Sequence, residues 1–355
     1  MEDQLCFVQF LHPGREHEPE THDRKEWNVR DHRRKFLQQP GRFVNADALA
    51  EADIVFWGEW EPESRVLRHI PSPVEGGPRF VYSPYYVVPV GDVFRQNTDP
   101  FVFGDHFRYV CCQQYRPSDG HPTQLRYLKE GSVLLFGSSL GGQFGLDTVF
   151  VVADYEDYTP ASGTEARTPR PSAYDDVTLK RIYPYLSYRL YRGASYADPY
   201  HGMYSFFPCR PAAACPAGFA RPRIINPQVI TGTHTQGRRL NKQGSLDEVQ
   251  RLWEDVLNQV IHQNLDIGVY ARVPDGYHSD GSPVSLGAGQ DLVTTWGGKS
   301  EAETRSKVRS ISGGSRLRGK CRESVLSGGS QRRSHSSPRH PGPLRGRKSV
   351  TLYHM

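Results

Sequence analysis

Short apolar runs, rich in β-branched and aromatic residues, dominate the hydrophobic pattern of the first 160 residues. The clearest runs are LCFVQFL, ADIVFWGEW, RFVYSPYYVVPV, FRYVCCQQ, GSVLLFGSS and FGLDTVFVVADY. Pro84 and Pro89 confine the third run to a sheet edge or an irregular crossing, and RRKFLQQPGRFV predicts a hairpin around Pro40 and Gly41. Because little helical periodicity separates these runs, the pattern predicts a mainly antiparallel or barrel-like sheet.

The strongest helical pattern lies near the end of the body, in SLDEVQRLWEDVLNQVIHQN. Ser245 and Glu248 form a capping box, and Asp247 adds favourable charge at the helix start. Apolar residues recur at spacings of three and four from Leu246 to Ile261, which gives one apolar face. The pattern predicts one long amphipathic helix packed on the sheet, then a strand at LDIGVYARV, and therefore an α+β fold.

A connector rich in Pro, Ser and Thr, TPASGTEARTPRPSAY, divides the body. On this basis we predict a β-rich subregion over residues 1–160 and an α/β subregion over residues 176–283 that shares the same core. Residues 284–355 are predicted to form a disordered basic tail.

Charge separates this tail from the body. From Lys299 to Lys348, fourteen Lys or Arg face three acidic residues, whereas the rest of the chain has 30 basic and 36 acidic side chains. Such a polar segment buries too little apolar surface to offset the entropy of ordering. Its composition fits a nucleic-acid-binding arm, a solvated extension or, given the abrupt change near Ser285, out-of-frame translation. The lack of aromatic residues favours the last two.

No apolar run approaches the roughly 20 residues that cross a bilayer, and MEDQLCFVQFLHPG lacks the segments of a secretory signal. The six cysteines form neither a disulfide framework nor a C-x-x-C pair. These features predict a cytoplasmic protein with reduced thiols and no membrane partner. Cys111 and Cys112, expected on a strand, should point to opposite faces and not share a metal.

A polar stretch with four of the fourteen histidines follows the first predicted strand: His12, His17, His22 and His32. The first three recur every five residues, which fits neither a helix nor a strand, and prolines between them indicate a loop. We therefore predict no metal there, although long-range folding could bring His32 or Glu59 alongside. A substrate-facing loop remains an alternative.

Glu59 lies between Trp57 and Trp60 in IVFWGEWEPES, where partial desolvation would raise its pKa and suit a general acid or base. With Asn97 and Asp99, the two rings suggest an aromatic pocket for a nucleobase. Glu59 is accordingly our predicted catalytic residue, and the other four are predicted ligand-binding residues. The alternatives are a solvent-facing Glu59 opposite the rings, and plain turn residues at Asn97 and Asp99.

The triplet Tyr191–Arg192–Gly193 resembles the first motif of ADP-ribosyltransferases, in which the arginine binds the phosphates of NAD. The resemblance implies a ligand-binding role for Arg192. The later motifs of that family do not follow in the body, and a surface arginine paired with a carboxylate is the simpler interpretation. Cys209 and Cys215 could supply a nucleophile, but no local basic pattern marks either as activated.

Several segments together resemble a family of uncharacterised bacterial proteins over about residues 5–275: FVQFLHPGREH, IVFWGEWEPES, NTDPFVFGDHFRYVCCQQ, GSVLLFGS and LDTVFVV. The resemblance implies a bacterial cytoplasmic protein with one integrated body, and it transfers no catalytic residue. EGSVLLFGS and the apolar strand after it also resemble the small barrels of PUA-like readers of modified nucleotides, at the level of the fold.

The sequence thus favours a nucleotide- or nucleic-acid-associated module for binding or modification. The alternatives are an NAD-consuming transferase and a non-catalytic interaction protein. The absence of a P-loop, of G-x-G-x-x-G and of G-x-S-x-G favours the last. Cofactor, oligomeric state and the existence of a reaction stay open.

Overall fold

The computed structural model describes residues 2–12, 14–19, 33–45, 48–88, 98–116, 118–162, 169–225, 239–241 and 245–284. Of residues 239–241 only the backbone is described. All of these residues belong to the first of two compact units, residues 1–292. The predicted tail therefore lies outside the described residues, apart from Val284.

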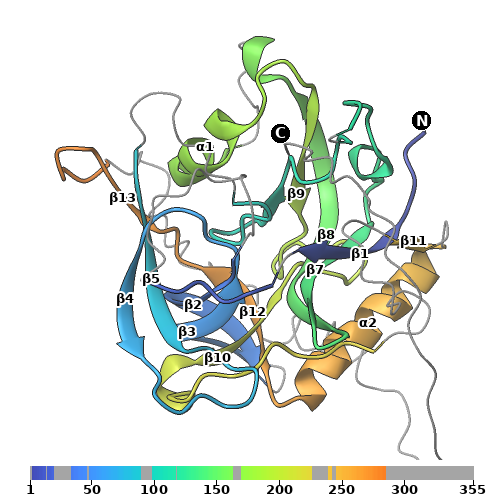
Figure 1. Ribbon diagram of the computed structural model, residues 1–355. Coiled ribbons are helices and arrows are strands. Elements are labelled where there is room, and N and C mark those ends of the chain that lie inside the picture. Colours follow the sequence, from blue (N-terminus) through green and yellow to red (C-terminus); the bar gives the residue numbers. More distant parts are fainter. Residues whose placement is uncertain are drawn as a thin grey trace, which may run out of the picture. The chain divides into compact units, whose positions relative to one another are not determined.

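The first sheet has six strands (Figure 1). In spatial order they are β11 (Arg239–Asn241), β1 (Phe7–His12), β7 (Val133–Leu140), β8 (Gln143–Tyr158), β9 (Tyr188–Gly193) and β6 (Arg108–Tyr109). Strands β1 and β7 run parallel, whereas the β7–β8 and β8–β9 pairs are antiparallel.

The second sheet has seven strands. In spatial order they are β12 (Asp266–Ala271), β10 (Phe207–Pro211), β3 (Ala48–Gly58), β2 (Lys35–Asn45), β5 (Phe80–Val87) and β13 (Asp275–Tyr277), with β4 (Ser64–His69) paired to β5. Strand β12 also pairs with β2, so β2, β3, β10 and β12 form a closed ring of pairings.

The sheet-rich body is confirmed, but both sheets are mixed rather than antiparallel. The parallel pairs are β1–β7, β2–β5 and β5–β13. Parallel pairing needs a long connection between the two strands. The chain supplies one here, because β1 and β7 are separated by more than a hundred residues.

The predicted hairpin at Pro40 and Gly41 is also wrong. Strand β2 runs through both residues, which pair with Asp53 and Ala52 of β3. Gly41 is needed for close packing, not for a turn: a Cβ there would lie 2.6 Å from the carbonyl oxygen of Tyr270. A tight contact between strands and a turn favour the same residue type, so the sequence alone did not distinguish them.

Within the described residues, two α-helices accompany the sheets, α1 (Ser172–Val177) and α2 (Leu246–His262), which lie in different parts of the body (Figure 1). Short 3₁₀ turns are η1 (Gln124–Arg126), η2 (Pro160–Ser162), η3 (Leu179–Arg181) and η4 (Ala212–Ala214). The predicted cap is present, since Ser245 Oγ accepts the Glu248 N–H at 3.2 Å. At 17 residues α2 is an ordinary globular helix rather than a long one.

Two apolar clusters make up the interior. One face of α2 is buried in the second cluster, together with Trp57, whereas Trp60 belongs to the first cluster. Among the described residues, no helix has the length and apolar character needed to cross a membrane.

Candidate functional site

Several deeply buried charged side chains gather beyond the C-terminal ends of β1 and β3. Arg34 lies between two carboxylates, with Nη1 2.9 Å from Glu59 Oε2 and Nε 3.0 Å from Asp147 Oδ2. Arg221 reaches the other oxygen of Asp147 (Nε–Oδ1 3.0 Å), and its guanidinium lies 4.3 Å from the ring centroid of Trp57. His12, the last residue of β1, has Nδ1 3.1 Å from Glu59 Oε2. We call these five charged residues the buried charge cluster.

A β-bulge places Asp147 in this cluster. Phe136 pairs with Thr148 and Gly137 with Leu146, which leaves Asp147 as the extra residue of β8. A bulge re-aims a side chain and is often found beside functional sites. Gly137 permits the close approach, because a Cβ there would lie 2.3 Å from the carbonyl oxygen of Gly145.

Positive and negative charges are equal in number among the arginines and carboxylates of the buried charge cluster. The side chains of Arg34, Glu59, Asp147 and Arg221 are each at most 4% exposed. Two guanidinium groups therefore face two carboxylates, which limits the cost of burying charge. Proton transfer between His12 and a neighbouring acid would leave this balance unchanged.

That neighbouring acid is the thiol of Cys112, which is hydrogen-bonded to His12. The same imidazole has its Nδ1 3.1 Å from Glu59 Oε2. Thiol, imidazole and carboxylate thus lie in the order found in cysteine nucleophile sites, where the carboxylate orients the base. Cys112 is half-buried, unlike the fully buried Cys6 and Cys209.

A rigid turn presents Cys112. Asp99 Oδ1 accepts the N–H of Val110 (2.9 Å), and its Oδ2 accepts the N–H groups of Cys111 (2.7 Å) and Cys112 (2.8 Å). Gln113, directly after the thiol, has φ +60°, a conformation uncommon for a residue with a side chain. Such backbone outliers cluster at functional sites. Burial and the charge of Cys112 raise the pKa of the Asp99 carboxyl to about 8, although the three backbone donors act to lower it.

The prediction that Cys111 and Cys112 point to opposite faces of a strand is therefore wrong. Strand β6 ends at Tyr109, and both cysteines lie in the turn after it. The possible ligand atoms of Asp99, Cys111 and Cys112 lie within 4.8 Å of one another. Because the Asp99 carboxylate already accepts three backbone N–H groups, we interpret it as the residue that holds the turn.

The surroundings favour the charged form of both partners. A hydrogen bond with Cys111 lowers the pKa of Cys112; burial opposes this, and the hydrogen bond and charge of His12 lower it further, to about 5. Burial raises the pKa of Cys111 well above its ordinary value. Burial also acts to lower the pKa of His12, but the charge of Glu59 and the hydrogen bonds with Cys112 and Glu59 prevail and raise it. A thiolate beside an imidazolium is the result.

The predicted pocket residues meet only in part: Glu59 belongs to the buried charge cluster, the Trp57 ring lies against Arg221 of that cluster, and Asp99 holds the Cys112 turn. The indole N–H of Trp57 donates to the carbonyl oxygen of Phe219 (2.8 Å), and that of Trp60 donates to the carbonyl oxygen of Glu63 (2.9 Å). Both rings are buried, in different clusters. Asn97 lies outside the described residues.

Glu59 does not face solvent opposite the rings, as strand alternation would place it. It follows the end of β3, is 5% exposed, and faces His12 and Arg34 rather than solvent. Arg192, from the ADP-ribosyltransferase-like triplet, pairs with Asp154 (Nη2–Oδ2 2.5 Å) and contacts His106 (3.2 Å).

Sequence reasoning missed Arg34, Asp147, Arg221 and Cys112. A signal existed for Asp147, because a carboxylate inside the apolar run FGLDTVFVV is costly to bury. Cys112 and His12 are a hundred residues apart, so no local spacing could pair them.

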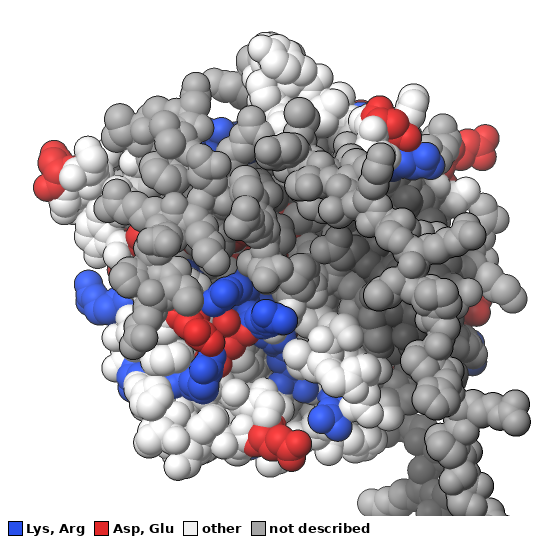
Figure 2. Space-filling view, in the orientation of Figure 1, with Lys and Arg blue, Asp and Glu red and all other residues white. Residues whose placement is uncertain are grey.

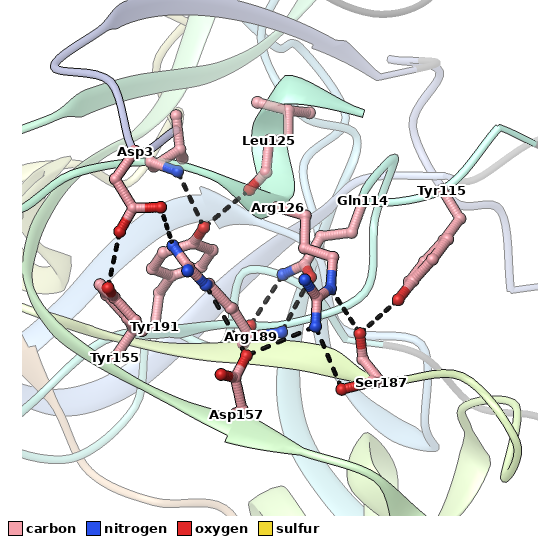
Figure 3. Close-up of polar contacts among 11 residues, drawn as sticks. Asp3, Gln114, Tyr115, Leu125, Arg126, Tyr155, Asp157, Ser187, Arg189 and Tyr191 are labelled. Carbon is pink, nitrogen blue, oxygen red and sulfur yellow. Dashed lines mark hydrogen bonds and ion pairs between the residues drawn. The ribbon is translucent and has the colours of Figure 1, made fainter. Parts of the chain in front are cut away.

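Charged groups at the surface are arranged differently. Figure 2 shows basic and acidic side chains next to one another in the lower half of the face seen. Exposed ion pairs include Arg79–Glu18 and Arg42–Asp105. A larger surface network joins the N-terminal segment to β8 and β9 (Figure 3). In it, Arg189 Nη1 lies 2.8 Å from Asp3 Oδ1, and Arg126 Nη2 lies 3.4 Å from Asp157 Oδ1.

No family model, curated protein or solved structure matches this chain. The resemblance to uncharacterised bacterial proteins, the bacterial origin and the cytoplasmic location therefore stay predictions from the sequence.

Proposed function

We propose that the protein is an enzyme that uses Cys112 as the nucleophile in acyl transfer or hydrolysis. One observation carries the proposal: His12 lies between the Glu59 carboxylate (3.1 Å) and the Cys112 thiol. A nucleophile, a base and a group that orients the base are the parts such chemistry needs. The fixed turn and the half-buried thiol add support.

The proposed reaction follows from these positions. The Cys112 thiolate attacks the carbonyl carbon of an ester, thioester or amide, and the carbonyl electron pair moves to oxygen. When the carbonyl re-forms, the bond to the leaving group breaks and the His12 imidazolium gives its proton to that group. Neutral His12 then removes a proton from water, which hydrolyses the thioester and regenerates the thiolate. Glu59 stabilises the imidazolium by its charge.

The test uses p-nitrophenyl acetate as an acyl donor for the full chain. We expect rapid release of one equivalent of p-nitrophenolate, and peptide mass spectrometry should locate the acetyl group on Cys112. Cys112→Ser should abolish this burst, and His12→Gln should slow it by about tenfold or more near pH 6, because loss of the imidazolium raises the pKa of the thiol.

Cys215→Ser is the matched control, since burial raises the pKa of that thiol. It should leave the burst unchanged. Acetylation of other cysteines at the same rate as Cys112, or a full burst in His12→Gln, would overturn the proposal.

The nucleotide-associated function predicted from the sequence is a second proposal. The observation that favours it is not the pair of tryptophans but a pair of arginines on adjacent strands. Arg108 of β6 lies directly opposite Arg192 of β9. Saturable binding of a nucleotide to the full chain, measured by calorimetry, would support this function, and a lack of binding would oppose it.

A further inference from the structure

Three charged residues form a row across strands β8, β9 and β6. Asp154 lies opposite Arg192, and Arg192 lies opposite Arg108. Arg192 is matched with Asp154, since its Nε and Nη2 both donate to Asp154 Oδ2 (2.8 and 2.5 Å). The residue opposite Arg108 on the adjacent strand is therefore another arginine and not a carboxylate. Like charges directly opposite each other on antiparallel strands destabilise a sheet.

The backbone pattern brings these two arginines close. The N–H and C=O groups of Arg108 both bond to Phe101, at 2.8 Å each. The pairing with Arg192 is therefore of the non-hydrogen-bonded type, in which opposite side chains lie closest. His106 holds Arg192 in place, with ring nitrogens 3.2 Å from Arg192 Nη1 and 3.2 Å from the carbonyl oxygen of Gly193.

Among the described residues, the guanidinium of Arg108 has no carboxylate within ion-pair distance. Arg108 is 5% exposed; its Nη2 donates to the carbonyl oxygen of Pro169 (2.6 Å), and its Nε has no hydrogen-bond partner. In the described part of the chain, no carboxylate forms an ion pair with it: Asp154 is engaged by Arg192 and Asp175 by Arg170, and Glu156 acts on the pKa of Arg108 only through its charge. The hydroxyl of Tyr174, whose ring centroid lies 5.8 Å from the guanidinium, is likewise buried without a hydrogen-bond partner.

A buried cation without an opposite charge is costly, and a buried donor without an acceptor adds to the cost. Both costs fall if an anion binds beside the guanidinium. We propose that Arg108, assisted by Arg192 and Tyr174, binds an oxyanion, the phosphate or carboxylate group of a small molecule. The planar fork of N–H donors suits both groups. This inference is independent of the chemistry proposed for Cys112.

The experiment measures thermal unfolding of the full chain in sodium phosphate, sodium acetate and sodium chloride at equal ionic strength. Wild type should melt at a higher temperature in phosphate or in acetate than in chloride. A larger shift in phosphate would indicate that the site binds a phosphate group, and a larger shift in acetate that it binds a carboxylate group. Arg108→Met should lose this shift. In chloride, Arg108→Met should melt at or above the wild-type temperature, because an unmatched buried charge has been removed.

Arg42→Met is the matched control, because it removes one charge from the Asp105 ion pair elsewhere. Arg42→Met should keep the wild-type shift in melting temperature. Comparison with this control separates anion binding at Arg108 from the general effect of phosphate on unfolding. An equal shift in Arg108→Met and Arg42→Met, or no shift in wild type, would overturn the inference.

A second variant covers the case in which Arg108→Met does not fold. Arg108→Lys keeps the charge but loses the fork, so its phosphate or acetate Kd should rise by about tenfold or more by calorimetry, a change of about 1.4 kcal/mol. An unchanged Kd would refute a site at Arg108.

Discussion

The protein contains two networks in which arginines pair with carboxylates. The two networks have similar composition but differ in how far their side chains are exposed to solvent. In the buried charge cluster, Asp147 is held between Arg34 and Arg221 with a side chain only 4% exposed. In the surface network, Asp157 lies between Arg126 and Arg189 with a side chain 62% exposed, at the longer distances of 3.4 and 3.7 Å.

The comparison shows that burial, and not the number of ion pairs, decides what such a network does. Water and salt screen the surface pairs, so each contributes little to stability. In the buried charge cluster the same charges are costly to leave unmatched. That cluster therefore fixes the position of Glu59, and through it the charge on His12 beside Cys112.

The largest expected effect is on stability. Asp147→Asn removes the charge that two buried arginines share, and should lower the free energy of unfolding by about 3–5 kcal/mol. Asp157→Asn makes the same chemical change at the surface and should cost less than about 1 kcal/mol. Urea unfolding of both variants checks this. Similar losses would mean that burial does not separate the two networks.

A smaller effect is expected on the reactivity of the thiol. In Cys111→Ala the hydrogen bond that lowers the pKa of Cys112 most is lost, so this pKa should rise. The rate of Cys112 alkylation by iodoacetamide near pH 6 should then fall, because less of the thiol is ionised. The fall should be about tenfold for each unit by which the Cys112 pKa exceeds 6.

Asp157→Asn serves as the control for alkylation, because the surface network does not contact the thiol. Its pH profile should match wild type, with a midpoint near the Cys112 pKa of about 5. An unchanged profile in Cys111→Ala would show that the neighbouring thiol does not stabilise the thiolate.

The smallest expected effect is a pH dependence of stability. The pKa of Cys112 falls from its ordinary 9.0 to about 5 on folding, so its contribution is absent below pH 5 and grows as the pH rises. The pKa of His12 is raised from 6.5, so its contribution is complete below pH 6.5 and declines above. This rise from Cys112 between pH 5 and 6.5 is opposed by Asp99, whose pKa is raised from 3.8 to about 8 and whose contribution declines over the same range.

Cys112→Ser should lose the contribution of the thiolate, so its stability should decline relative to wild type as the pH rises above 5, whereas Asp157→Asn should keep the wild-type pH dependence. Urea unfolding across the same pH range measures both variants, and an unchanged pH dependence in Cys112→Ser would exclude the thiolate as its source.

Prediction from the sequence succeeded where the evidence was local. The cap at Ser245, the apolar face of α2 and the sheet-rich body were all visible as spacing and residue type. It failed at Pro40 and Gly41, at the position of the two cysteines and in the antiparallel order of the sheet. In each case the outcome depended on a partner strand or on a distant carboxylate.

The sequence by itself determined most of the strands and the helix α2, because backbone geometry and apolar spacing act over a few residues. It also supplied Glu59 as a notable carboxylate and left open that Glu59 joins the histidines, but it did not give Arg34 as its partner. Only the tertiary structure decided that His12, Arg34, Glu59, Cys112 and Asp147 meet. Those contacts join segments up to 113 residues apart. They depend on how two mixed sheets, a bulge at Asp147 and the Asp99 turn bring strand ends together, and no local pattern encodes that arrangement.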